Sequence, residues 1–101
     1  MLESDKVESA TLVERVRAAV RELKTQFPVS RVVLFGSLAH QGWFVPDSDV
    51  DLAVEGLSPA NYWKAWRLLE TTIGDRPVDL VELETAGASL KQAINRYGIE
   101  L

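Results

Sequence analysis

The sequence has 101 residues, of which 47% are hydrophobic and 26% charged, and its formal net charge is −4. This is the composition of a globular chain, and it excludes an intrinsically disordered one. Cysteine is absent, which excludes disulfides, thiolate catalysis and cysteine zinc sites, and the acidic balance argues against direct binding of nucleic acid through its phosphates.

The length predicts a single domain over residues 1–101. No apolar run approaches the roughly 18 residues that a membrane-spanning helix needs. The N-terminus lacks the basic and then apolar layout of a secretory signal. We therefore expect a cytoplasmic location and no membrane partner.

Predicted helices and strands alternate along the chain. Thr11 and Glu14 have capping-box spacing and predict a helix from Thr11 to Phe27, which Pro28 ends. Strands are predicted over residues 31–35, 49–55 and 77–83, and further helices over 58–73 and 86–97. Strands separated by helices predict an α/β fold, with helices packed against a small sheet.

Aspartates enter the second and third predicted strands. Residues i and i+2 of a strand share a face, so Asp49 and Asp51 project together while the residues between them point into the core. In the third predicted strand, Val78 and Leu80 point into the core and Asp79 points to the other side. If the two strands are neighbours, three carboxylates converge, and their repulsion raises at least one pKa. Mg²⁺ prefers carboxylate oxygens, so these residues are the predicted ligands of a metal site, with two ions expected.

A Gly-Ser turn follows the first predicted strand. Gly36 lets the backbone come close to a ligand, and Ser37 offers its hydroxyl and the free N–H groups of a helix start to a phosphate. Taken alone, a Gly-Ser turn, an Asp-x-Asp pair or an aspartate on an edge strand has an ordinary explanation, such as a solvated strand end or a charge that discourages aggregation. Together they predict nucleotide transfer from a triphosphate.

The segment LFGSLAHQGWFVPDSDVDLAV (residues 34–54) resembles the signature of the nucleotidyltransferase superfamily that includes DNA polymerase β, and in particular its minimal nucleotidyltransferase (MNT) domains. The matching residues are Gly36, Ser37, Asp49, Asp51 and Asp79. The resemblance implies a small mixed sheet flanked by helices, and transfer of a nucleotide, commonly AMP from ATP, with Mg²⁺. It implies that the three aspartates are the catalytic and metal-binding residues.

The same resemblance points to MntA-type antitoxins of MNT/HEPN toxin–antitoxin pairs. The implied partner is a HEPN-type ribonuclease toxin in a hetero-oligomer, which the antitoxin neutralises by adenylylation, by binding, or both. One alternative is a catalytically weak or inactive antitoxin that acts by binding alone. Another is a nucleotidyltransferase for a small molecule such as an aminoglycoside, although the chain has little room for a separate acceptor-binding domain.

The turn departs from the family pattern at two places. His40 stands where members often have an arginine that helps to hold phosphates, and eleven residues separate Ser37 from Asp49, one more than usual. We expect His40 and Ser48 to bind the nucleotide together with Gly36 and Ser37. His40 is at best partly cationic near neutral pH, and a polar turn histidine without a ligand is the alternative.

Aromatic residues surround the predicted site. Tyr62 and Trp66 share a helix face with Leu69 and Ile73, which predicts packing on the sheet, whereas Trp63 lies about 100° further round the helix, at the rim. Trp43 and Phe44 fall in the loop between the Gly-Ser turn and the aspartates. This aromatic pair would dock a partner, fill the core or stack on a base.

Overall fold

The structure is a computed structural model that describes residues 2–36, 39, 49–74 and 76–101. Within these residues, four strands form one sheet in the order β3–β2–β1–β4. They are β1 (Arg31–Phe35), β2 (Val50–Glu55), β3 (Val78–Glu82) and β4 (Ile99–Glu100). β1 pairs antiparallel with β2 and β4, whereas β2 and β3 are parallel. The expected small mixed sheet flanked by helices is confirmed.

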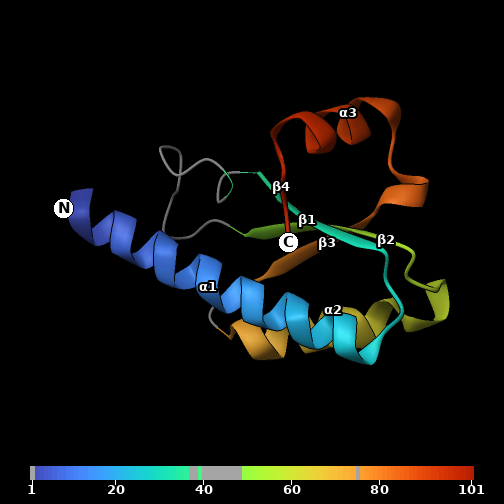
Figure 1. The fold of residues 1–101 in the computed structure, drawn as a ribbon, viewed down its shortest axis with the longest axis horizontal. Coiled ribbons are helices and arrows are strands. Elements are labelled where there is room, and N and C mark those ends of the chain that lie inside the picture. Colours follow the sequence, from blue (N-terminus) through green and yellow to red (C-terminus); the bar gives the residue numbers. More distant parts are fainter. Residues whose placement is uncertain (1, 37–38, 40–48, 75) are drawn as a thin grey trace.

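Helices lie on both faces of the sheet (Figure 1). α1 (Leu2–Gln26) and α2 (Tyr62–Ile73) cover one face, and α3 (Ala88–Tyr97) lies on the other. A 3-10 helix at Pro59–Asn61 leads into α2, and a second one at Leu83–Thr85 follows β3. In the part of the chain that the structure describes, no helix has the length and hydropathy to cross a membrane.

The larger core lies between the sheet and the pair α1 and α2. The alternate residues of β2 that the sequence directs inward, Val50, Leu52 and Val54, are fully buried there. Burying a side chain of this size contributes about 1.5–3 kcal/mol. α1 adds a stripe at helical spacing, formed by Leu12, Val16, Ala19, Val20 and Leu23.

A smaller core lies under α3, on the opposite face of the sheet. It consists of Val33, Ala53, Leu83 and Ile94. Ile94 is the buried residue of α3, so it is the single apolar anchor of this helix among the described residues, and Asn95 adds a hydrogen bond from Arg31 of β1. Val33 and Ala53 are register partners on β1 and β2, and the next pair along this face brings the aspartates into position.

Two expectations about helix starts are wrong. α1 begins at Leu2, so Thr11 lies inside the helix and does not cap it. Residues 2–10 include Leu, Glu, Lys and Ala, which have high helix propensity, and these continue the helix past the local capping signal. Ser58 precedes a 3-10 helix rather than α2 itself, and its side chain makes no capping hydrogen bond.

Candidate active site

Asp51 and Asp79 come from adjacent parallel strands. In the register of β2 and β3, Asp51 pairs directly with Asp79, and on its other side Asp51 pairs with Phe35 of β1. The condition set by the sequence, that the two acidic strands are neighbours, is therefore met. Asp79 and Asp49 are exposed, whereas Asp51 is partly buried. We call Asp49, Asp51 and Asp79 the carboxylate row.

Within the carboxylate row, Asp51 is the residue whose pKa is clearly shifted. The pKa of Asp51 is raised from its ordinary value of 3.8 to about 6, first by burial and then by the negative charges of Asp79 and Asp49. Both neighbours are thus near enough to disfavour ionisation of Asp51. The sequence anticipated a raised pKa from repulsion, and burial proves to be the larger cause.

Gly36 lies against the carboxylate of Asp51 at the end of β1. A Cβ added at Gly36 would fall 2.2 Å from Oδ2 of Asp51, and the φ angle of Gly36 is +76°. Only glycine combines that backbone conformation with so close an approach. The N–H of Ala39 donates to the carbonyl of Gly36 at 3.2 Å, so the chain turns immediately after the strand.

Several residues expected at the site lie outside the described part of the chain. Among those predicted to bind the nucleotide, Gly36 is described. The other predicted nucleotide-binding residues, Ser37, His40 and Ser48, lie outside the described residues. The loop aromatics Trp43 and Phe44 also lie outside them.

Two aromatic side chains of α2 hold β3 in place. The hydroxyl of Tyr62 donates to the carbonyl of Leu80 at 2.5 Å, and Nε1 of Trp66 donates to the carbonyl of Val78 at 2.9 Å. These two carbonyls flank Asp79 in the strand, so both bonds fix the backbone that carries this carboxylate. The sequence predicted that this helix face packs on the sheet but not its hydrogen bonds. The available signal was the polar tip that Tyr and Trp present when buried.

The negative charges near the site also affect the pKa of Tyr62. Burial raises the pKa of its hydroxyl, followed by the negative charges of Asp79 and Glu82. The phenol therefore stays protonated and remains a hydrogen-bond donor. The position of Asp79 is supported from the helix side by a neutral group that does not compete for a cation.

The chemistry of the carboxylate row suits a hard divalent cation. A cation beside Asp51 would favour its ionised form and so offset the effects of burial and of like charge. Among the described residues, no three His, Cys, Asp or Glu side chains form a metal-binding group. Mg²⁺ commonly takes one or two carboxylates and completes its coordination with water and substrate phosphates. The residues present fit that mode of binding.

Comparison with known proteins places the chain in a family. Residues 19–101 match the family model described as polymerase beta, nucleotidyltransferase. The chain belongs to this nucleotidyltransferase family. No curated protein sequence matches it.

Solved structures share the nucleotidyltransferase fold with this chain. A "putative minimal nucleotidyltransferase" is 29% identical with a TM-score of 0.76, over 92% of this chain and 95% of the other. A toxin–antitoxin crystal structure with AMP-PNP is 28% identical with a TM-score of 0.69, and the match covers 82% of this chain and 69% of the other. The crystal structure of the toxin–antitoxin MntA-HepT is 26% identical with a TM-score of 0.64, and the match covers 85% of this chain and 68% of the other. The resemblance to minimal nucleotidyltransferases and MntA-type antitoxins, first drawn from the Gly-Ser and Asp-x-Asp motifs, is confirmed.

Proposed function

We propose that the chain is an Mg²⁺-dependent nucleotidyltransferase that moves AMP from ATP to a protein acceptor, and that it acts as the antitoxin of a HEPN-type ribonuclease toxin. The observation that carries the proposal is the pairing of Asp51 with Asp79 beside Gly36. Family membership and the likeness to a toxin–antitoxin structure with AMP-PNP support the same activity.

The reaction requires a hydroxyl oxygen of the acceptor to attack the α-phosphorus of ATP. The bond between that phosphorus and the bridging oxygen of pyrophosphate breaks, and the hydroxyl proton leaves. Asp79 is exposed at the open edge of the sheet, so it is the residue placed to orient the hydroxyl and accept its proton. Asp49 and Asp51 would hold Mg²⁺, which supplies charge neutralisation for the phosphates.

The phosphates would lie over the turn that follows β1. Gly36 leaves a close approach to the backbone next to the carboxylate of Asp51, and Ser37 follows it in sequence. His40 and Ser48 complete the predicted set in the same loop. In this proposal the triphosphate and the carboxylate row would meet at the end of the strands where β1 finishes.

The test is the intact mass of the partner. The protein encoded by the neighbouring reading frame, which the proposal expects to be of HEPN type, is mixed with the chain, ATP and Mg²⁺, and we expect its mass to rise by one or more AMP units. Asp49→Asn with Asp51→Asn should abolish the increase, as should EDTA. Glu55→Gln, at the far end of β2, is the matched control and should leave transfer intact. Transfer by the double aspartate variant would overturn the roles assigned here.

A second function is favoured by the sequence of the turn. His40 replaces an arginine common in the family, and an antitoxin with a weakened site would neutralise its partner by binding alone. Calorimetry with Mg²⁺ and ATP separates the two functions, because a binding-only antitoxin has no metal-dependent affinity for the nucleotide. Rescue of cell growth by the double aspartate variant, as complete as by the wild type, would favour this second function.

A further inference from the structure

The outward face of α2 carries an exposed tryptophan. Trp63 is 70% exposed, more than Leu90, Tyr97 or Ile99, the other exposed large hydrophobic residues of the described chain. Its ring stands edge-on to those of Tyr62 and Trp66, with centroids 5.1 and 5.8 Å away. The indole is therefore supported by two rings that are themselves bound to β3, and little conformational freedom remains to be lost on binding.

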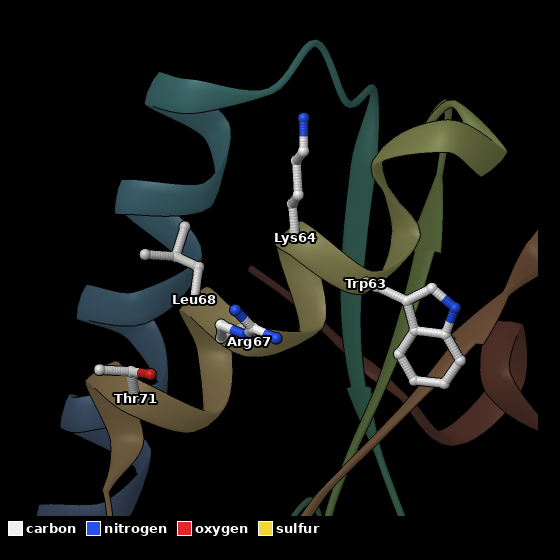
Figure 2. Close-up of a pocket in the computed structure, with 5 residues that line it drawn as sticks. All are labelled: Trp63, Lys64, Arg67, Leu68 and Thr71. Atoms are coloured by element: carbon white, nitrogen blue, oxygen red, sulfur yellow. The ribbon is translucent and has the colours of Figure 1, made fainter.

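The exposed indole lies at one end of a groove. Figure 2 shows Trp63 and Leu68 directed to different sides of α2, with Arg67 between them, and Leu68 directed towards α1. The groove has a volume of about 400 Å³, and its lining is formed by Trp63, Lys64, Arg67, Leu68 and Thr71. Its lining therefore combines one exposed indole and one leucine with two cations.

The charge of this groove is opposite to that of the whole molecule. Lys64 and Arg67 line it without an acid, in a chain whose net charge is −4. The acid of α2 is Glu70, and its Oε2 accepts a hydrogen bond from the N–H of Val78 at 3.1 Å. Glu70 is therefore directed to the sheet. Within the described residues, Lys64 and Arg67 make no hydrogen bond or ion pair, so their charges are available to a ligand.

We propose that this groove docks an acidic segment of the partner protein, with one apolar side chain held against Trp63 and carboxylates paired with Lys64 and Arg67. Exposed tryptophan and arginine are the residues that most often dominate binding energy at protein interfaces. Two cations are too few for a nucleic-acid surface on an acidic chain, since each neutralised phosphate needs its own cation.

The groove and the carboxylate row lie on different sides of the sheet. α2 covers the face to which Val78 and Leu80 point, whereas Asp51 and Asp79 point to the other face. β3, which α2 holds through the bond from Tyr62 to Leu80, is the edge strand. A partner held in the groove would reach the carboxylates by extending past this edge. The identity of this partner, a HEPN-type toxin, rests on the proposed function, whereas the docking surface rests on the groove itself.

The test uses calorimetry to measure binding of the protein encoded by the neighbouring reading frame, which the proposed function expects to be of HEPN type. We expect Trp63→Ala, and separately Lys64→Glu with Arg67→Glu, to weaken the Kd by at least about tenfold. Lys91→Glu with Arg96→Glu, on α3 across the sheet, makes the same change of net charge and should alter Kd by less than about twofold. Raising the salt from about 0.05 to about 0.5 M should weaken the wild-type complex more than the Lys64/Arg67 variant.

The outcomes separate docking from catalysis. Asp49→Asn with Asp51→Asn should bind the partner as the wild type does. Tight binding by the wild type without AMP transfer would reject the proposed function and keep the groove. Unchanged affinity in both groove variants overturns the docking proposal, as does a wild type that forms no complex. So does wild-type affinity for a single-stranded oligonucleotide, or self-association in ultracentrifugation, that the groove variants lose, because either result assigns the groove to another ligand. Circular dichroism confirms that each variant is folded.

Discussion

Asp51 and Asp79 are register partners on parallel strands, and Asp51 has the raised pKa. Parallel pairing places two like charges side by side on one sheet face, where directly opposed like charges are unfavourable. Ionisation of Asp51 therefore lowers the stability of the folded chain, because this carboxylate is also partly buried. The row therefore lowers the stability of the fold when no cation offsets its charge.

The first prediction is a pH dependence of stability without Mg²⁺. Because the pKa of Asp51 is about 6 in the folded chain and 3.8 ordinarily, the folded chain binds more protons here between these values. The stability that this group provides is fully present below pH 3.8 and lost as the pH rises through about 6. After allowance for screening, the loss should be about 1–2 kcal/mol.

Urea unfolding in EDTA, from about pH 4 to about pH 6.5, measures this loss. The variant Asp51→Asn keeps the shape of the side chain and cannot titrate. Its free energy of unfolding, relative to the wild type, should rise across this range. A difference that stays constant with pH would show that Asp51 has an ordinary pKa.

The second prediction concerns Gly36. The variant Gly36→Ala should lower the free energy of unfolding by more than about 2 kcal/mol, because its Cβ would lie 2.2 Å from Oδ2 of Asp51 and its φ is positive. Gly74→Ala has a similar φ of +90° and no atom within 4 Å of the added Cβ. It should show the conformational cost alone, about 1–3 kcal/mol, and Gly36→Ala should exceed it because of the clash with Asp51. Equal losses in the two variants would mean that the carboxylate moves aside freely.

The third prediction concerns the anchoring of β3. The variant Trp66→Phe removes the donor to the carbonyl of Val78 and should cost about 0.5–1.5 kcal/mol of unfolding free energy. Trp63→Phe makes the same chemical change on the exposed ring and should cost less than about 0.5 kcal/mol. Urea unfolding of both variants gives the comparison. If Trp66→Phe is as mild as its control, the bond from α2 does not hold the strand.

The fourth prediction concerns the attachment of α3. The variant Ile94→Ala empties the small core under this helix and should cost about 2–4 kcal/mol. Leu90→Ala, on the same helix but 37% exposed, should cost under about 1 kcal/mol. Hydrogen exchange should show faster exchange of α3 amides in Ile94→Ala, with β2 amides less affected. Protection of α3 equal to that in the wild type would contradict the single-anchor description.

Alternation along the strands was the most informative part of the sequence. The inward positions of Val50, Leu52 and Val54 follow from the two-residue period of a strand. The shared face of Asp49 and Asp51 stays a prediction, because β2 begins at Val50. The period of a helix likewise predicted that Tyr62 and Trp66 pack on the sheet. These features depend on local geometry, so one sequence is enough to derive them.

Features made by distant residues could not be derived in this way. β4 has two residues, too few for a periodic signal, and it forms because Ile99 and Glu100 pair with β1. Arg31 reinforces that pairing through an ion pair with Glu100 at 3.0 Å and a hydrogen bond to Asn95 at 2.6 Å. The start of α1 also differs from the prediction. The capping pattern at Thr11 is local, whereas the residues before it favour a helix and extend α1 back to Leu2.

The parallel pairing of β2 with β3 requires a crossover, and α2 provides it. One uninterrupted stretch, from Asp49 to Asp79, therefore encodes every member of the carboxylate row. Recombination between related genes within this stretch would split the row, whereas exchange at its borders would move it intact. The three carboxylates thus depend on one continuous segment of the chain, whereas Gly36, which lies against Asp51, comes from the end of the strand before it.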